Sequence, residues 1–348
     1  MDILLVGTYT QHDAPAVLEK QELGKGIYLI LYNETTGSVT GDPLIIQMKN
    51  PSWVCLVKNR LFAVSEREDA AEIIEYEVSI HEEKLTARQR ACLEMPGKAS
   101  CHIEKDEKGK RLFVSDYGSG DLKVIDISEN GSPKLLQEIS FTGNGLDPER
   151  QEASHLHSCL LHGEDLYAAD LGCDKIYSFG TDKNKLTQKE TINVRPGAGP
   201  RHMEILEKNG ETYLYVLNEL DITISVYCKG HLCQRVSLAE SVPEGVLAAE
   251  LCVAEGKMLY ASVRGTGEIL GFTIEENGML NLKQKVLIPD GWFRSICLDS
   301  SENHLLAADQ KTGRIYIFDR QPDGELINKR VLVEVPVPVQ VLPGKIES

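Results

Sequence analysis

The stretch "LFVSDYGSGDLKVIDI", residues 112–127, holds two short runs of alternating and β-branched residues joined by a glycine-containing turn. Such runs, bounded by Gly, Asp and Asn, indicate β-strands. Near-copies of the first run recur as "LLVGTY" (4–9), "LFAVSE" (61–66), "LYAADL" (166–171), "LYVLNE" (214–219), "LYASVR" (259–264) and "LLAADQ" (305–310). Helical periodicity is scarce, so the pattern predicts an all-β protein.

The spacing of these copies points to one architecture. Successive copies start 57, 51, 54, 48, 45 and 46 residues apart. Several are followed, after a turn, by a third strand such as "LKVIDI" or "KIYSFG", and then by a more variable fourth strand. Seven units of four short strands are typical of a β-propeller. We therefore expect a single domain over residues 1–348, a seven-bladed β-propeller with four-stranded antiparallel blades.

An inner strand precedes each copy except the first, and it allows a test of register. The third residue of the short segment that begins each inner strand, such as "PSW" or "PRH", is, in order, Trp53, His102, His157, His202, Glu250 and Ser295. The first unit lacks this strand, but "PVQVLP" (338–343) places Gln340 one further repeat along the chain. We expect this C-terminal strand to join the first blade and close the ring, which removes exposed sheet edges.

Composition narrows the classes of partner. The chain has 348 residues, of which 42% are hydrophobic and 26% charged, and a net charge of −16. This charge argues against nucleic acid or an anionic membrane as partner, and no segment approaches the about 20 apolar residues that span a bilayer. Nine scattered cysteines without a CxxC pair, and no signal-peptide pattern, predict a cytoplasmic protein. Nothing in the pattern sets an oligomeric state.

Propeller geometry gives the polar residues a common location. The start of each inner strand and the end of each second strand lie on one face, beside the central channel. Two columns are expected to meet there, with Arg201 and Arg294 directly before the inner one. The inner column is Trp53, His102, His157, His202, Glu250, Ser295 and Gln340, and the second is Tyr9, Glu66, Tyr117, Leu171, Glu219, Arg264 and Gln310. Titratable groups gathered in one concavity indicate an active site; a water-filled channel without function is the alternative.

Single residues in these columns have two readings each. Glu219 shares a blade with Arg201 and His202, and is either a general base or a structural ion-pair partner. Glu66 is in the same register in its own blade as Glu219, and either lies at the mouth of the channel or is a solvated charge on a loop. Arg264 is expected opposite Glu250 within one blade. Arginine suits a carboxylate or phosphate ligand, because its planar fork donates two parallel hydrogen bonds.

Two long insertions and one histidine pair complete the candidate site. The segments 10–24 and 142–153 belong to the same face and are expected to rim or cover it. "SHLHS" places His155 and His157 on one face of a strand by alternation. Such a pair binds zinc if His102, His202 or Glu250 supplies a third ligand. Since no other metal spacing is present, we favour a site without metal or cofactor.

Several motifs in the sequence resemble the lactonase family of seven-bladed β-propellers over essentially the whole chain. They are "GTYT" (7–10), "GKGIY" (24–28), "SCHIEKDEKGKRLFVSDYGSGDLKV" (100–124), "HLHS" (155–158), "ADLGCDKI" (169–176), "GAGPRHMEI" (197–205), "LNEL" (217–220) and "AAEL" (248–251). The resemblance implies hydrolysis of 6-phospho-D-glucono-1,5-lactone to 6-phosphogluconate in the pentose phosphate pathway. It also implies functional positions at His157, Arg201, Glu219 and Arg264.

The resulting hypothesis assigns catalysis to His157, Arg201 and Glu219. His157 or Glu219 activates water, Arg201 stabilises the oxyanion, and Arg264 or Arg294 holds the phosphate of a small anionic sugar lactone. The expected substrate contacts are His102, His155, His202, Glu250, Arg264, Arg294 and Glu66. The alternatives are a lactonase or lactonizing enzyme for another carboxylated small molecule, and a non-catalytic propeller that binds protein.

Overall fold

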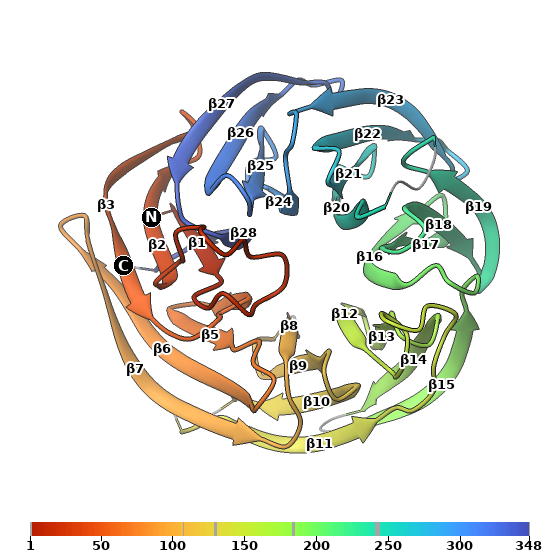
Figure 1. Cartoon of the computed structure of the whole chain (residues 1–348), viewed down its shortest axis with the longest axis horizontal. Coiled ribbons are helices and arrows are strands. Elements are labelled where there is room, and N and C mark those ends of the chain that lie inside the picture. Colours follow the sequence, from red (N-terminus) through yellow and green to blue (C-terminus); the bar gives the residue numbers. More distant parts are fainter. Residues whose placement is uncertain (1, 107, 129–130, 183–184, 241–243, 348) are drawn as a thin grey trace.

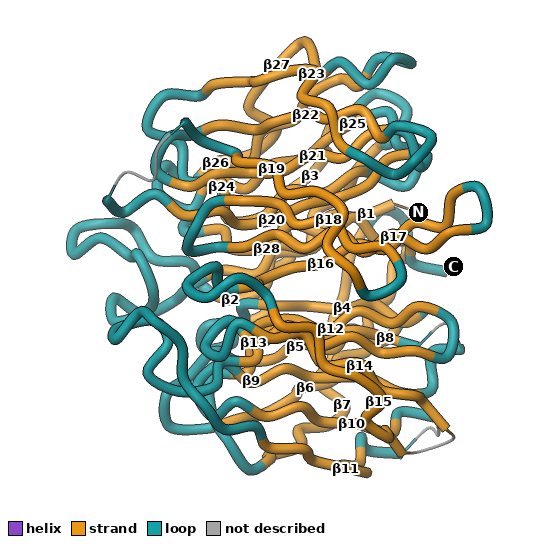
Figure 2. Tube along the Cα trace, turned by 90° about the vertical axis from the view of Figure 1, so that its right-hand side faces the viewer, coloured by secondary structure: helices purple, strands orange, loops and turns teal. Residues whose placement is uncertain are grey.

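The computed structural model describes residues 2–106, 108–128, 131–182, 185–240 and 244–347. Within them, 28 strands form seven four-stranded antiparallel sheets around a central channel (Figure 1). Turned by 90°, the strands cross the thickness of the disc and the loops gather at its two faces (Figure 2). The predicted seven-bladed β-propeller is confirmed. No helix among the described residues is long and apolar enough to cross a membrane.

The blades are numbered 1 to 7 along the chain, starting from the sheet that contains β1, and each contributes one strand at each distance from the channel. The inner strands are β28 (Pro338–Lys345), β4 (Trp53–Val57), β8 (Ser100–Lys105), β12 (Leu156–His162), β16 (Pro200–Lys208), β20 (Leu247–Ala254) and β24 (Phe293–Leu298). The second strands are β1 (Asp2–Thr8), β5 (Arg60–Val64), β9 (Arg111–Asp116), β13 (Asp165–Asp170), β17 (Glu211–Asn218), β21 (Met258–Arg264) and β25 (His304–Asp309).

The remaining strands complete the blades outward. The third strands are β2 (Gly26–Asn33), β6 (Ala71–His81), β10 (Asp121–Asp126), β14 (Lys175–Asp182), β18 (Thr223–Cys228), β22 (Glu268–Ile274) and β26 (Arg314–Arg320). The outer strands are β3 (Ser38–Gln47), β7 (Lys84–Met95), β11 (Lys134–Ser140), β15 (Lys185–Asn193), β19 (His231–Ser237), β23 (Leu280–Leu287) and β27 (Leu326–Glu334).

The hydrophobic core lies between neighbouring blades rather than at the centre of the disc. One buried cluster joins Tyr215 and Leu217 of β17 to Leu251 of β20 and Leu259 of β21. Second strands are covered on both faces, and β21 is buried along its whole length. Outer strands such as β15 expose most of their residues. This explains why the "LY" copies are the strongest repeat signal, since strands packed on both faces read as near-continuous apolar runs.

A buried carboxylate at the end of three second strands fixes the loop that enters the inner strand. Asp116 accepts a hydrogen bond from Ser100 Oγ at 2.6 Å. Asp170 accepts one from the His155 backbone N–H at 2.9 Å. Asp309 accepts one from the backbone N–H of Trp292 at 3.1 Å. Because all three aspartates are fully buried, these bonds hold the channel-mouth segments of blades 3, 4 and 7 in place.

The ring closes through the two ends of the chain, as predicted. β28 pairs antiparallel with β1, from Asp2 opposite Lys345 to Gly7 opposite Gln340, and the termini lie in the same part of Figure 1. The Gln340 side chain then bonds the next blade, because its Oε1 accepts from Val54 N at 2.6 Å and its Nε2 donates to Val54 O at 3.2 Å. The first blade is thus tied to its neighbour as well as completed.

Deleting residues 338–348 is expected to abolish cooperative folding. The deletion removes β28, leaves β1 with an unpaired edge, and takes away Val339 and Val341, which are 3% and 1% exposed. Each such side chain contributes about 1.5–3 kcal/mol to a stability of typically about 5–15 kcal/mol. Thermal melting followed by circular dichroism checks this result. A control that lacks only residues 347–348 should melt like the full chain; unchanged melting of the longer deletion would contradict closure by β28.

Candidate active site

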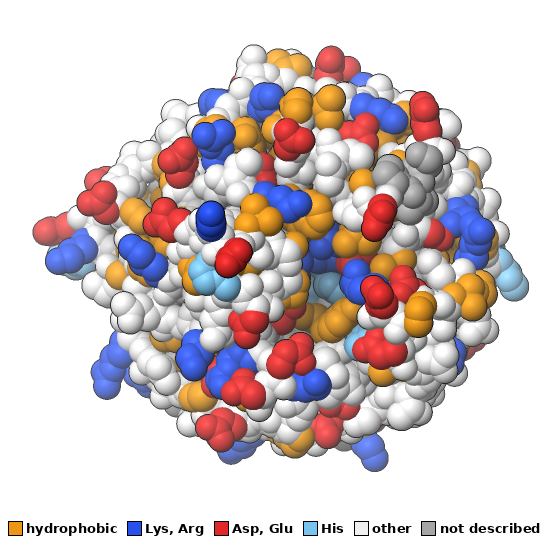
Figure 3. Space-filling view, in the orientation of Figure 1, with side chains coloured by type: hydrophobic (Ala, Val, Ile, Leu, Met, Phe, Trp, Pro, Cys, Tyr) orange, Lys and Arg blue, Asp and Glu red, His pale blue; other side chains and the backbone are white. Residues whose placement is uncertain are grey.

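Aromatic side chains from four successive blades meet in the channel. The ring centroids of Trp53 and His102 are 4.4 Å apart, those of His102 and His202 are 5.5 Å apart, and those of His157 and His202 are 5.2 Å apart. The face seen in Figure 3 is hollowed at its centre, where basic, acidic and histidine side chains gather. Four residues of the predicted inner column, Trp53, His102, His157 and His202, therefore lie together in the channel.

The register of blade 4 differs from the prediction by one residue. In blade 5, Pro200 pairs with Asn218 and His202 with Leu217, so Arg201 is the extra residue of a β-bulge. In blade 4 the equivalent bulge lies between Leu156 and Ser158, so His157 occupies the position of Arg201. Ser158, not His157, continues the inner column. Alternation counted from the sequence cannot register this extra residue, since a bulge breaks the period of two.

The same bulge explains why arginine and histidine follow each other at the mouth. A bulged strand places two residues against one of its partner and re-aims a side chain. Arg201 and His202 are consecutive, and both contact residues that line the channel mouth: Arg201 bonds Glu219, and His202 bonds Glu250. Arg294 is the bulged residue of blade 7, between Phe293 and Ser295. His157, Arg201 and Arg294 are thus the bulged residues of blades 4, 5 and 7, and each directly precedes the residue that continues the inner column.

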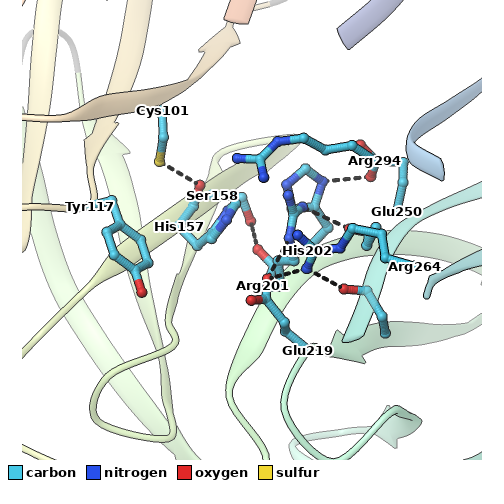
Figure 4. Close-up of polar contacts among 12 residues, drawn as sticks. Cys101, Tyr117, His157, Ser158, Arg201, His202, Glu219, Glu250, Arg264 and Arg294 are labelled. Carbon is cyan, nitrogen blue, oxygen red and sulfur yellow. Dashed lines mark hydrogen bonds and ion pairs between the residues drawn. The ribbon is translucent and has the colours of Figure 1, made fainter. Parts of the chain in front are cut away.

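Glu219 lies at the centre of three arginines. Its Oε1 accepts from Arg150 Nη2 at 2.6 Å, and its Oε2 accepts from Arg201 Nε at 2.7 Å. Arg264 Nη2 lies 3.0 Å from the same Oε2. Figure 4 shows Arg201 and Arg264 directed at this carboxylate. The predicted ion pair between strands one and two is therefore present, and it extends to two further segments of the chain.

These arginines determine the protonation of Glu219. Burial by itself would raise the pKa of this carboxyl, but the charges of Arg264, Arg150 and Arg201 outweigh burial and hold the pKa well below the usual value. Burial lowers the pKa of Arg264 to about 9, which leaves its guanidinium protonated at pH 7. Glu219 is thus an ionised carboxylate with both oxygens occupied, an arrangement suited to positioning arginines rather than accepting a proton.

Arg150 belongs to this cluster but was not among the predicted site residues. It lies on the insertion 142–153, whose turn is held by Asp147 Oδ1, which accepts from the Glu149 and Arg150 backbone N–H groups. Gln151 Oε1 accepts from two further backbone N–H groups of the same loop. Strand register assigns no position to an insertion, so only its expected place on this face pointed toward the site.

Arg264 does not face Glu250, and that expectation was wrong. Arg264 pairs in register with Leu247, donates from Nη2 to Ala248 O at 2.9 Å, and reaches Glu219 of the neighbouring blade. An irregularity between Ala248 and Leu251 turns Glu250 elsewhere. Glu250 instead bonds His202, with 2.5 Å between Oε1 and Nδ1.

Glu66 and Arg294 meet at Tyr9 on the other side of the mouth. Arg294 Nη2 donates to Tyr9 Oη at 2.7 Å, and Tyr9 Oη donates to Glu66 Oε2 at 2.8 Å. The side chains of Arg294 and Glu66 are 10% and 11% exposed. Of the two interpretations of Glu66, the structure supports the one that places it at the mouth of the channel.

His155 and His157 do not share a strand face. β12 begins at Leu156, so His155 belongs to the preceding loop, where its ring stacks on Tyr117 with centroids 4.4 Å apart. Its Nδ1 bonds Tyr117 O at 2.8 Å and its Nε2 bonds Glu152 at 3.1 Å. In the part of the chain that the structure describes, no group of three or more His, Cys, Asp or Glu side chains is placed to hold a metal ion.

The histidines deeper in the channel are neutral. Burial, together with the charge of Arg201, lowers the pKa of His157 and of His202 well below the usual value. Burial likewise lowers the pKa of His102, and it raises that of Glu250 to about 8. Among the described residues, His157 Nδ1 and His202 Nε2 are buried without a hydrogen-bond partner. The mouth therefore offers two imidazole nitrogens and several cationic donors to a bound molecule.

A cavity continues from this mouth along the channel axis. Its volume is about 210 Å³, and Trp53, His102, His202 and Glu250 are among the residues that line it. Glu104 and Glu204, two residues further along β8 and β16, line it as well. These two partly exposed carboxyls have raised pKa values, about 7 for Glu104 and about 8 for Glu204, because the loss of hydration inside the channel disfavours the charged form. The cationic character of the site is thus confined to the mouth.

Comparison with known proteins agrees with this geometry. Residues 3–343 match the family described as lactonase, 7-bladed beta-propeller. A Bacillus subtilis protein named 6-phosphogluconolactonase is 27% identical and covers 97% of this chain and 96% of its own length. A Formosa agariphila protein of the same name is 33% identical over 67% of this chain and 70% of its own.

A solved structure from Bacteroides fragilis superposes along nearly the whole length. It is 28% identical, with a TM-score of 0.85 over 99% of this chain and 98% of that one. The match of the family model extends from β1 to the closing strand β28, so it includes every blade. The chain belongs to the lactonase family of seven-bladed β-propellers.

Proposed function

We propose that this protein hydrolyses 6-phospho-D-glucono-1,5-lactone to 6-phosphogluconate, the activity that the names of its Bacillus subtilis and Formosa agariphila relatives carry. The observation that carries the proposal is the charge at the channel mouth. Four arginines, from blades 5, 6 and 7 and from the insertion, face two glutamates, Glu66 and Glu219. A cationic surplus in a chain of net charge −16 suits a small anionic substrate.

Arg201 is held in the orientation that oxyanion stabilisation requires. Its Nε donates to Glu219 and its Nη1 donates to Ala249 O at 2.7 Å. These two bonds fix the plane of the guanidinium, and within the described residues its Nη2 makes no hydrogen bond. When water attacks the lactone carbonyl, the carbonyl oxygen becomes negative, and a preorganised donor at that position stabilises the transition state. We assign this role to Arg201.

His157 is the group we assign to proton transfer. Its neutral imidazole has an unpaired Nδ1, so it accepts the proton of the attacking water as the new C–O bond forms. It then returns this proton to the ring oxygen as the bond between the carbonyl carbon and that oxygen breaks. Of the two groups considered from the sequence, Glu219 is less suited, because three arginines occupy its carboxylate. We assign Glu219 to positioning Arg201 and Arg264.

We place this activity in the cytoplasm as part of the same proposal. All nine cysteines are free thiols, and burial raises the pKa of several of them, including Cys101 and Cys159. Free thiols are the ordinary state of cysteine in a reducing compartment.

The activity is tested with freshly prepared 6-phosphogluconolactone. Release of 6-phosphogluconate is followed through an NADP-dependent 6-phosphogluconate dehydrogenase and compared with the spontaneous rate. We expect acceleration in proportion to enzyme concentration. Unphosphorylated glucono-1,5-lactone, followed by acid release, is the comparison substrate and should react with lower kcat/KM. No acceleration with either lactone would contradict the proposed function.

Replacing Arg201 by Ala is expected to lower kcat by about 10²–10³-fold, the usual cost of losing an oxyanion donor. Arg201→Lys keeps the charge but loses the two fixed hydrogen bonds, so we expect it to recover only part of the activity. Steady-state kinetics on the lactone measure both. Arg314→Ala, at an exposed ion pair with Glu334 on the rim of blade 7, is the matched control and should keep full activity. Undiminished turnover by Arg201→Ala would remove Arg201 from the mechanism.

The pH profile separates His157 from Glu219. Because the pKa of His157 is lowered, its basic form persists as pH falls through 6.5, so kcat should stay level between pH 6.5 and 8 and decline only at lower pH. His157→Gln should lower kcat by about 10²–10⁴-fold and remove this acidic decline. Glu219→Gln should lower kcat but keep the decline. Loss of the decline in Glu219→Gln, with its retention in His157→Gln, would reverse the two roles.

A further inference from the structure

One wall of the channel mouth is built from three segments of blades 6 and 7. The turn 265–267 follows β21, the segment 288–292 precedes β24, and the turn 310–313 follows β25. Gly267 O accepts from Ile288 N at 2.9 Å, and Gln310 N donates to Trp292 O at 3.1 Å. Asp309 Oδ1 accepts from the backbone N–H of Trp292 at 3.1 Å. These bonds join the three segments into a single surface beside Arg264.

This wall carries buried hydrogen-bond donors that have no acceptor among the described residues. Arg264 Nε, Thr266 Oγ1 and Trp292 Nε1 are buried and have no partner among the described residues. Arg264 is 3% exposed and Trp292 is 8% exposed. A buried donor without an acceptor is unfavourable, because it has lost its hydrogen bonds to water and gained none in return. Several such donors on one wall favour a ligand that brings acceptor oxygens.

Lys311 adds a positive charge to the same wall. Its Nζ lies 3.6 Å from the centroid of the Trp292 ring, and the Arg264 guanidinium carbon lies 5.9 Å from that centroid. Lys311 forms no ion pair within the part of the chain described. Burial lowers the pKa of Lys311, against the opposing charge of Asp309. An anion bound here would meet a cation that the protein itself does not pair.

The carboxylate of Asp309, two residues before Lys311, holds the turn 310–313 against the segment that precedes β24. Asp309 Oδ1 accepts from the backbone N–H groups of Trp292, Lys311 and Thr312. Two acceptors on this turn, Asp309 Oδ2 and Gln310 Oε1, are buried without a partner among the described residues. Unpaired acceptors suit hydroxyl groups. The wall thus combines donors for an anion with acceptors for hydroxyls, which is the hydrogen-bonding inventory of a phosphorylated sugar.

We propose that Arg264, Thr266, Trp292 and Lys311 form the subsite that binds the phosphate of the sugar lactone. The proposal rests on the proposed function and specifies which part of the mouth recognises the phosphomonoester. Arg264 bonds Glu219 together with Arg201, so a phosphate on this wall lies next to the group assigned to the oxyanion. Arg294, the alternative phosphate ligand considered from the sequence, is instead bonded to Tyr9.

Kinetics with two lactones test the subsite. Lys311→Gln is expected to raise KM for 6-phosphogluconolactone about tenfold, the loss of one partly desolvated charge pair, with kcat and the kinetics on glucono-1,5-lactone unchanged. Lys20→Gln, which removes an exposed charge from the insertion 10–24 on the same face, is the control and should change neither substrate. Equal effects of Lys311→Gln on both lactones, or no effect on KM for the phosphorylated one, would overturn the proposal.

A binding measurement keeps this test independent of catalysis. The chain has two tryptophans, so Trp53→Phe leaves Trp292 as the sole indole emitter. Titration with inorganic phosphate should change the Trp292 emission in Trp53→Phe, and the response should be lost when Lys311→Gln is added. If the protein hydrolyses neither lactone yet shows this response, the proposed function fails and the anion subsite stands. An emission unaffected by phosphate while Lys311 is present would overturn the subsite.

Discussion

The carboxylate of Glu219 makes a cationic site possible inside this propeller. Bringing the buried Arg201 and Arg264 together with the partly exposed Arg150 is unfavourable, because the guanidiniums repel each other and lose hydration. One ionised carboxylate, bonded to all three, offsets much of that cost. The three arginines come from blades 5 and 6 and from the insertion before blade 4. Their meeting point therefore depends on the packing of blades 4, 5 and 6 side by side around the channel.

The bulge at the start of the inner strands is the second device on which the site depends. A regular strand would turn Arg201 and His202 to opposite faces. With one extra residue, both side chains reach the channel mouth, and His157 and Arg294 take the equivalent position in blades 4 and 7. Buried aspartates at the ends of the second strands hold several of these strand openings in place. The catalytic assignments thus rest on backbone geometry as much as on residue type.

The mouth divides into regions of different electrostatic character. Around Glu219 the arginines are paired and fixed. Beside them the imidazoles of His157 and His202 are neutral, and each has a buried nitrogen without a partner among the described residues. Toward blades 6 and 7 lie donors without partners. Further along the channel the carboxyls of Glu104 and Glu204 have raised pKa values, because they lose hydration inside the channel, away from the arginines. A lactone with a phosphate at one end and a reactive carbonyl at the other is matched by this sequence of environments.

The repeat of "LY" strands determined the seven blades, and the spacing of Gln340 determined the closure, because strands buried on both faces need apolar runs at a constant period. The convergence of Glu66, Glu219, Arg264 and Arg294 followed from the same register. Tertiary structure alone decided that His157 sits at a bulge, that Arg264 bonds Glu219 rather than Glu250, and that Arg150 joins them. Bulges interrupt the alternation from which register is counted, and contacts between blades depend on distances in space that no spacing along the chain records.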